Sequence, residues 1–179
     1  MRVLGSSPAH RAARYYATVL TAMRSAQSSI WMTAAYFVPT HQEVVALKAA
    51  ARRGVDVRIL LPAHIDVPQV LAIQRSYYGS LLRAGVKVYE RRTGIVHSKA
   101  IVIDGVWSLV GSSNFDQRSV LFNDEVDVVV LGSSTADEVR RYMEADMRHA
   151  RRIDWKFVHR QGAWQHLKAL FWRIWEPLF

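Results

Sequence analysis

The sequence predicts an α/β protein in which a mixed, mainly parallel β-sheet is flanked by helices. Apolar segments of strand length alternate with segments of helical periodicity through residues 29–90, which is typical of right-handed crossovers between parallel strands. Asp104-Gly105 separates two further apolar segments and indicates a β-hairpin, so antiparallel strands join the sheet. The 179 residues suffice for one domain, which we place at residues 1–151, followed by a helical extension of the same domain at residues 152–179.

The N-terminal elements are predicted from periodicity and capping. Residues 1–7 fit a short strand, and residues 8–27 fit a helix with one apolar stripe. Residues 29–38 form an apolar run that suits a buried strand. Thr40-x-x-Glu43 has the spacing of a capping box, so we expect the next helix to begin there.

The next segments predict a second crossover and the strand after the hairpin. Residues 55–61 fit a strand, Asp66 is placed to cap a helix over residues 67–84, and residues 86–90 fit a third strand. After the hairpin, valines alternate with acidic side chains within residues 121–131, which predicts one more strand. Acidic side chains on so apolar a strand need polar partners, because an unpaired buried charge is costly.

The C-terminal part is predicted to be helical and basic. Ser134 or Thr135 is expected to cap a helix that reaches about His149. Apolar side chains recur at three- and four-residue spacing through residues 162–179, which predicts an amphipathic helix. Its basic face suits a membrane interface, and packing on this domain or on a partner fits the pattern equally well.

The composition favours anionic partners. The formal net charge is +9 and the isoelectric point is near 10.2, which suits nucleic acid or an anionic membrane surface. The absence of cysteine excludes disulfides and thiolate metal sites. No run of eighteen apolar residues and no secretory signal occur in the sequence, so we expect no membrane-spanning helix.

The residues that carry chemistry lie around the hairpin. Because side chains alternate along a strand, His97 and Lys99 share one face. With a two-residue loop, Ser112 on the returning strand lies opposite His97, Val110 lies opposite Lys99, and Asn114 follows on the same face. An imidazole, an ammonium, a hydroxyl and an amide are therefore predicted to converge on one patch.

Such a patch suits a phosphodiester. Histidine titrates near physiological pH, so it can act as a neutral nucleophile or as a general acid. Lys99 supplies a positive charge for phosphate oxygens, and Ser112 and Asn114 supply neutral hydrogen-bond donors. Backbone N–H groups after Gly111 can add an anion-binding nest. The protein donors carry the charge, so we expect no metal and no other cofactor.

The hairpin resembles the HKD motif of the phospholipase D superfamily, with the spacing His97-x-Lys99-x₄-Asp104-x₆-Gly111-Ser112-x-Asn114. Other segments resemble the cardiolipin synthase branch: Tyr36-Phe37-Val38-Pro39, residues 54–62, Arg75-Ser76-Tyr77-Tyr78, Asp116-x-Arg118-Ser119 and Asn123-x-Glu125. The resemblance extends over nearly the whole chain and is tightest over residues 30–130. Lipid synthases of this family carry two such motifs, whereas this sequence carries one and resembles their second half.

The resemblance implies a role for each motif residue. His97 is expected to attack phosphorus and form a phosphohistidine, while Lys99 binds the phosphate. An acidic residue is expected where Glu125 stands, and we interpret it as the carboxylate that orients the imidazole; pairing with an arginine is the alternative. Asp104 belongs to the family motif, but its opposite parity to His97 and its place in the turn predict a structural role.

The resemblance implies a phosphatidyltransferase of the cardiolipin synthase type that acts on phospholipid phosphodiesters. Such an enzyme is expected in peripheral contact with an anionic membrane, at the cytoplasmic face of the bacterial membrane. One histidine cannot be nucleophile and acid in the same step, so we expect a homodimer or association with another chain that bears an HKD motif. Two alternatives stay open: a nuclease that applies the same chemistry to nucleic acid, and an inactive orphan half-domain.

Overall fold

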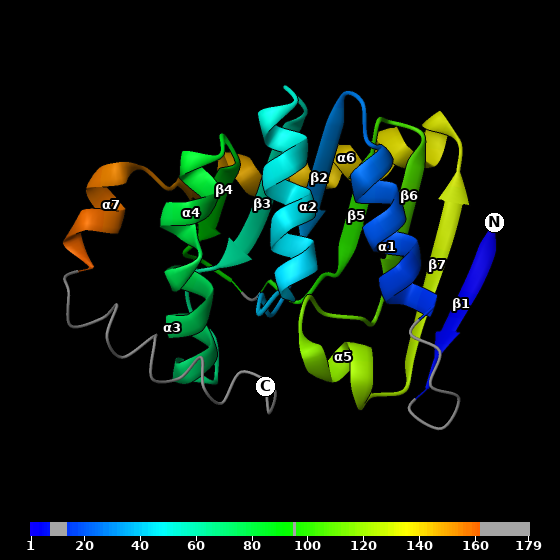
Figure 1. The fold of residues 1–179 in the computed structure, drawn as a ribbon, viewed down its shortest axis with the longest axis horizontal. Helices are drawn as coiled ribbons and strands as arrows, with labels where there is room; N and C mark the ends of the chain where they lie inside the picture. The colour runs from blue at the N-terminus through cyan, green and yellow to red at the C-terminus, as the bar shows by residue number, and fades with distance from the viewer. Residues whose placement is uncertain (8–13, 95, 162–179) are drawn as a thin grey trace.

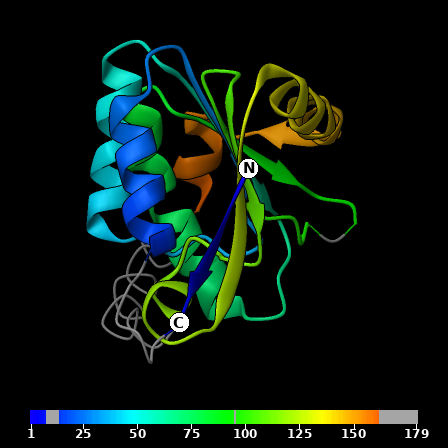
Figure 2. The ribbon, with the colours of Figure 1, turned by 90° about the vertical axis from the view of Figure 1, so that its right-hand side faces the viewer.

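The computed structural model describes residues 1–7, 14–94 and 96–161. An eight-stranded sheet, in the order β1-β7-β6-β5-β2-β3-β4-β8, separates α1 to α4 on one face from α6 on the other (Figures 1 and 2). The strands are β1 (Arg2–Ser6), β2 (Ser29–Thr33), β3 (Asp56–Pro62), β4 (Lys87–Arg91), β5 (Ala100–Ile103), β6 (Trp107–Gly111), β7 (Glu125–Leu131) and β8 (Ala150–Arg152). The helices are α1 (Arg14–Ser25), α2 (His41–Arg52), α3 (Pro68–Ser76), α4 (Tyr78–Arg83), α5 (Gln117–Leu121), α6 (Ser133–Arg148) and α7 (Trp155–Arg160).

The mixed α/β sheet confirms the predicted fold class, but its parallel part is smaller than expected. Among the strands that the structure describes, only β2, β3 and β4 pair in parallel, through crossovers that contain α2, α3 and α4. The pairings β1–β7, β7–β6, β6–β5, β5–β2 and β4–β8 are antiparallel. The description "mainly parallel" therefore applies only to β2, β3 and β4. The tight turn between β5 and β6 makes β6 return antiparallel beside β5.

Two apolar cores hold the layers together. The larger one lies between the sheet and the layer of α1 to α4, and its fully buried side chains include Ile30, Met32 and Ile59. The smaller core lies under α6 and is built around Trp31 and Leu60. The alternation of β2 side chains between these two cores explains its continuous apolar sequence, since both faces of the strand are buried.

Several predicted helix boundaries shift in the structure. The capping box of α2 is confirmed, because the Thr40 hydroxyl accepts from the Glu43 N–H and the Glu43 carboxylate accepts from the Thr40 N–H at 2.8 Å. The helix expected over residues 67–84 is divided into α3 and α4 at Tyr77. Asp66 does not cap it, because the N-cap is Val67 and no side chain caps this end. Its carboxylate instead accepts a hydrogen bond from the Tyr36 hydroxyl.

The C-terminal third contains elements that the sequence did not reveal. The N-cap of α6 is Gly132, at a φ of 143°, so the predicted caps Ser134 and Thr135 are wrong. The short α5 and β8 were not predicted, and β8 adds an antiparallel strand to β4. The short α7 lies within the segment 152–179 that was expected to be helical. The amphipathic helix predicted over residues 162–179 lies outside the described residues. Among the helices that the structure describes, none is both long and apolar enough to cross a membrane.

The hairpin is present with a register one residue away from the predicted one. Asp104 and Gly105 have φ angles of 53° and 66°, and the Val106 N–H donates to the Ile103 carbonyl at 3.2 Å, which is the tight turn expected. Val106 is an additional loop residue, so Ile103 pairs with Trp107 instead of Val106. The predicted pairings of Ser112 with His97 and of Val110 with Lys99 are therefore wrong by one position.

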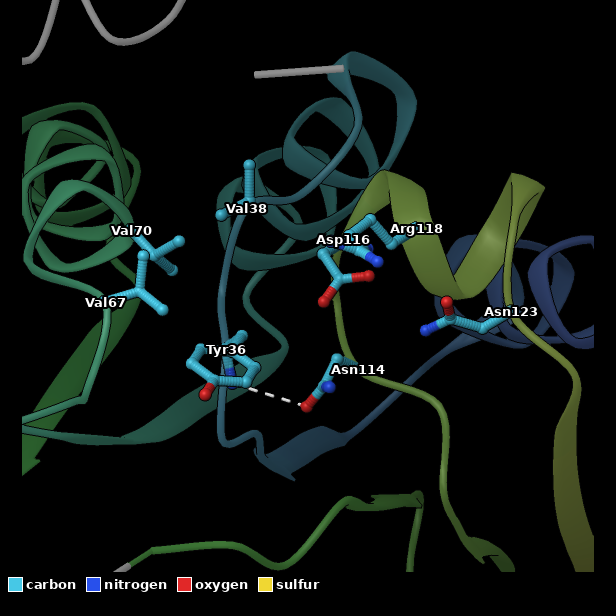
Figure 3. A pocket seen from close by; sticks show the side chains of 8 residues that line it. All are labelled: Tyr36, Val38, Val67, Val70, Asn114, Asp116, Arg118 and Asn123. Carbon is cyan, nitrogen blue, oxygen red and sulfur yellow. Dashed lines mark hydrogen bonds between the residues drawn. The ribbon is translucent and has the colours of Figure 1, made fainter. Parts of the chain in front are cut away.

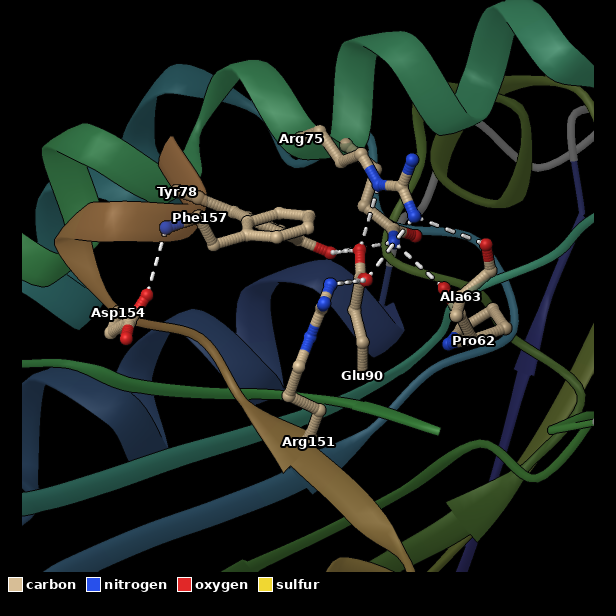
Figure 4. A network of polar contacts seen from close by, with 9 residues as sticks. Pro62, Ala63, Arg75, Tyr78, Glu90, Arg151, Asp154 and Phe157 are labelled. Atoms are coloured by element: carbon tan, nitrogen blue, oxygen red, sulfur yellow. Dashed lines mark hydrogen bonds and ion pairs between the residues drawn. The ribbon is translucent and has the colours of Figure 1, made fainter. Parts of the chain in front are cut away.

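A buried ionic network anchors α3, α4 and β8 to the sheet (Figure 4). Glu90 on β4 is 0% exposed and accepts from Arg75 Nε at 2.8 Å and from the Tyr78 hydroxyl at 3.0 Å. Arg151 on β8 lies 3.5 Å from the same carboxylate. A buried carboxylate is tolerated only with such partners. The segment Arg75-Ser76-Tyr77-Tyr78 thus contributes two side chains to the fold.

Candidate active site

The side chains predicted to form the site meet at one edge of the sheet. His97 and Lys99 precede β5, Asn114 follows β6, and Glu125 begins β7. Because β5 and β7 run antiparallel to β6, the start of each lies beside the end of β6. The segment after β2 that contains Tyr36 reaches the same edge, since β2 is also antiparallel to β5.

Lys99 and His97 are in direct contact. The Lys99 ammonium lies 3.0 Å from His97 Nδ1 and 3.3 Å from Nε2, and it donates to the His97 carbonyl at 3.0 Å. Lys99 is buried, whereas the imidazole is exposed. Burial lowers the pKa of Lys99 despite the opposing influence of the Glu125 and Asp116 carboxylates. The predicted patch of imidazole and ammonium is therefore present, although both residues stand before the strand and not within it.

Glu125 forms a compact polar cluster with three donors. Its carboxylate accepts from the Ser112 hydroxyl, from the Ser119 hydroxyl at 2.9 Å and from Asn123 Nδ2 at 3.1 Å. Ser112 was predicted to face substrate, and in the structure its hydroxyl is engaged with Glu125. His97 is not among the hydrogen-bond partners of Glu125 in the described residues. The prediction that Glu125 orients the imidazole stays a prediction.

Asn114 connects the motif to the segment after β2. Its side-chain oxygen accepts from the Tyr36 N–H at 3.4 Å, and its own N–H donates to the Ser119 hydroxyl at 3.0 Å. The Tyr36 hydroxyl donates to Asp66 at 2.5 Å, and this hydrogen bond, with burial, raises the pKa of Tyr36 to about 12. Tyr36 is thus held protonated between the ends of β2 and β3.

Gly111 leaves the space that the loop after β6 needs. Asp127 on β7 is fully buried, and its carboxylate accepts from the Ser113 hydroxyl at 2.5 Å and from the Ser113 N–H at 3.3 Å. A Cβ at position 111 would lie within 3.0 Å of Asp127 atoms, a separation that real Cβ atoms essentially never show. Only glycine lets Asp127 reach Ser113 and fix the backbone that carries Asn114.

Asp104 lies away from this edge. It follows β5, whereas His97 precedes that strand. Its carboxylate accepts from the backbone N–H groups of Ser28 at 2.7 Å, Ser29 at 2.9 Å and Gln27 at 2.9 Å. Burial opposes the charged form, but these hydrogen bonds outweigh it and lower the pKa of Asp104. Its contacts agree with the structural role predicted from its parity.

Two cavities flank Tyr36. One, of about 370 Å³, is lined by His97, His64 and Asp66. The other, of about 260 Å³, is lined by Asn114 and Arg118 among others, and Figure 3 shows it from close by. Tyr36 therefore lines both cavities of the site.

Sequence reasoning missed several residues of this edge. His64 and Asp66 follow β3, and the carboxyl end of a parallel strand is where ligands gather in open α/β sheets, so their position after Pro62 was the available signal. Ser119 is three residues after Asp116, whose carboxylate accepts from the Ser119 N–H at 2.7 Å as the N-cap of α5. That spacing is a cap signal that predicts α5. Within the described residues, no group of three or more His, Asp or Glu side chains is arranged to hold a metal ion.

Comparison with known sequences identifies relatives over most of the chain. Residues 19–147 match the family described as "Cardiolipin synthase, PLD-like domain". Cardiolipin synthase A of Erwinia tasmaniensis is 35% identical over 178 residues, which cover 99% of this chain and 37% of that protein. Cardiolipin synthase of Geobacillus kaustophilus is 41% identical over 142 residues, 79% of this chain and 28% of that protein. The chain thus spans about a third of the length of these relatives.

Solved structures share the fold. The phospholipase D family member Nuc from Salmonella typhimurium superposes with a TM-score of 0.72 at 27% identity, over 85% of this chain and 97% of that chain. Phosphatidylserine synthase from Haemophilus influenzae superposes with a TM-score of 0.73 at 10% identity, over 99% of this chain and 47% of that chain. At that identity the second likeness concerns the fold alone.

Replacing Gly111 tests whether the loop after β6 depends on close approach. Gly111→Ala places a Cβ against Asp127, and we expect it to lower the free energy of unfolding by about 1–3 kcal/mol, as overpacking does. Gly5→Ala is the matched control, because nothing lies within 4 Å of a Cβ there, and it should change stability by less than about 0.5 kcal/mol. Urea titration measures both. Equal stability of the two variants would show that Asp127 imposes no such constraint.

Proposed function

The chain belongs to the PLD-like domain family of cardiolipin synthases, and we propose that it transfers a phosphatidyl group between phospholipid alcohols through a phosphohistidine at His97. The observation that carries this proposal is the contact of the Lys99 ammonium with both ring nitrogens of His97. A nucleophile and a phosphate-binding cation are side by side there. The relatives named cardiolipin synthase support a lipid as the substrate.

The first step forms the phosphohistidine. A ring nitrogen of His97 attacks phosphorus of phosphatidylglycerol, a P–N bond forms, and the bond from phosphorus to the glycerol oxygen breaks. Lys99 neutralises charge on the non-bridging oxygens, and the Asn114 amide is available as a further donor. The leaving glycerol oxygen takes a proton from a general acid. In the second step the hydroxyl of another phosphatidylglycerol attacks phosphorus, gives its proton to that same group and releases His97, which yields cardiolipin.

The general acid must be another residue, because His97 has its nitrogen on phosphorus. We propose that it is His97 of a second copy of this chain, or the motif histidine of another chain. The face of β1, β7 and β6 beside α6 supports this: Val3, Val110 and Val126 there are 59%, 47% and 59% exposed. This valine face adjoins the site, since the Val126 N–H donates to the Ser112 hydroxyl at 3.0 Å. Apolar side chains in such a cluster favour burial against a partner.

The proposed setting is the surface of an anionic membrane. The net charge of +9 attracts the chain to anionic phospholipids, each basic residue near the surface contributing about 1 kcal/mol. We place the protein peripherally at the cytoplasmic face of the bacterial membrane. The same charge also suits nucleic acid, so a phosphodiesterase acting on DNA is the competing function.

Parallel assays on lipid and on DNA separate these functions. We expect phosphatidylglycerol vesicles to yield cardiolipin and glycerol, and plasmid DNA to stay supercoiled. His97→Ala should reduce lipid turnover by roughly 10³-fold or more, because it removes the nucleophile. Products are measured by lipid mass spectrometry and by agarose gel.

His149→Ala is the matched control for that substitution, because His149 is exposed at the end of α6, away from the site. It should leave turnover unchanged. Nicked plasmid that depends on His97 would replace the lipid proposal with the nuclease, and inactivity on both substrates would favour an inactive half-domain. Light scattering of the active fraction measures its oligomeric state. Turnover by a pure monomer would contradict the proposal that a second chain supplies the general acid.

The charge of Lys99 predicts an alkaline limit to activity. Only the protonated amine neutralises phosphate, and burial lowers its pKa below the ordinary 10.5, so kcat/KM should fall as pH rises through that lowered value. Lys99→Arg keeps its charge at every pH tested, so its reduced kcat/KM should no longer fall in this range. An ether-linked lipid, which resists alkaline hydrolysis, permits the measurement from pH 7 to about pH 10. An alkaline limb that is the same in both proteins would assign it to another group.

A further inference from the structure

We propose that the cavity between α3 and α5 binds the phosphate of the acceptor phospholipid, with Arg118 as its cation. This inference rests on the proposed function and specifies its second substrate. The cavity has a volume of about 260 Å³ and is open to one side of Tyr36. Figure 3 shows valines on one side of it and polar side chains on the other. The residues that carry the argument are Val38, Val67, Val70, Asn114, Arg118 and Asn123.

The Arg118 guanidinium has its charge available. It forms no hydrogen bond and no ion pair with any other side chain in the part of the chain that the structure describes, although the side chain lines the cavity. Asp116 is the carboxylate in the same wall, and its Oδ1 already accepts from the Ser119 N–H at 2.7 Å. Burial raises the pKa of Asp116 more than the charge of the nearby Arg118 lowers it, so this carboxylate competes only weakly for the guanidinium. A planar guanidinium that is not engaged by another side chain can donate two parallel hydrogen bonds to two oxygens of a phosphate.

The opposite wall is apolar. Val67 and Val70 come from the start of α3, and Val38 comes from the segment before α2. Three valines offer nothing to a nucleic-acid backbone or to a free inorganic ion, whereas they suit the ester and first methylene groups of a diacylglycerol. A ligand that places a phosphate at Arg118 and alkyl groups on the valines is an anionic phospholipid.

The position relative to His97 makes this ligand the acceptor. Asn114 lines the cavity and belongs to the motif, while Tyr36 lines both this cavity and the one that holds His97. A phosphatidylglycerol whose phosphate lies at Arg118 has its free hydroxyl at the end of a three-carbon bridge. That bridge extends past Tyr36 toward the phosphohistidine. Arg118 therefore selects an acceptor that carries its own phosphate, and water or a neutral alcohol gains nothing from it.

Competition between acceptors tests this selection. Wild-type protein, Arg118→Gln and Arg118→Lys are incubated with phosphatidylglycerol in the presence of 1-butanol, and cardiolipin, phosphatidylbutanol and phosphatidic acid are quantified together. We expect Arg118→Gln to reduce cardiolipin about tenfold, the equivalent of one charge-assisted hydrogen bond. The butanol and water products should change less than about twofold. Arg118→Lys should restore part of the cardiolipin.

Arg52→Gln is the control for loss of one charge, because Arg52 is exposed in the last turn of α2, far from the cavity at the other end of the helix. It should leave all three product yields unchanged. An equal fall of the three products in Arg118→Gln, or an unchanged cardiolipin share, would overturn the acceptor site while leaving the proposed function intact. Absence of every lipid product from the wild-type protein would instead remove the proposed function, and the acceptor site with it.

Discussion

The contact between the Lys99 ammonium and the His97 ring is the interaction on which the rest of the site depends. A positive charge on a lysine this buried is costly unless an anion neutralises it, and burial therefore lowers the pKa of Lys99. The Lys99 side chain turns back onto the His97 carbonyl and ring, so the ammonium and the imidazole form one unit. In the proposed mechanism, a phosphodiester binds to this unit and presents its phosphorus to the imidazole.

The directions of the strands bring the other site residues close to His97 and Lys99. Antiparallel pairing brings the start of β5 beside the end of β6, and the end of β6 beside the start of β7. The loop after β6 is fixed by a hydrogen bond from the Ser113 hydroxyl to the Asp127 carboxylate. Gly111 leaves the space that this carboxylate occupies. The Glu125 carboxylate, at the start of β7, accepts hydrogen bonds from the Ser112 and Ser119 hydroxyls. Asn114 is consequently positioned by the buried side chains of Asp127, Ser113, Glu125 and Ser119, and its own side chain adds a contact with the Tyr36 N–H.

Patterns within short segments of the sequence predicted the proximity of His97 to Lys99 and the turn at Asp104-Gly105. Period-two alternation indicated that His97 and Lys99 share a face, and the positive φ angles at Asp104-Gly105 are those its turn chemistry requires. The predicted register between β5 and β6 is wrong because Val106 is an additional loop residue, and its carbonyl accepts from the Gly132 N–H at 2.8 Å beyond the end of β7. Asp66 failed as a cap for a similar reason, since Tyr36 from another strand end takes its carboxylate. The spacing of these groups along the chain gives no signal for such contacts.

Two cations are proposed to bind two different phosphates at the site. We propose that Lys99 binds the phosphate that is transferred and that Arg118 binds the phosphate of the lipid that receives it. Tyr36 lines both the cavity of His97 and the cavity of Arg118. Both assignments require a covalent intermediate on His97. The most direct measurement is peptide mass spectrometry after an alkaline quench during turnover of short-chain phosphatidylglycerol, since a phosphohistidine is labile to acid. We expect a phosphatidyl group on His97 that forms and decays with the reaction. Continued turnover with His97 unmodified at every time point, or with the lipid on another residue, would contradict it.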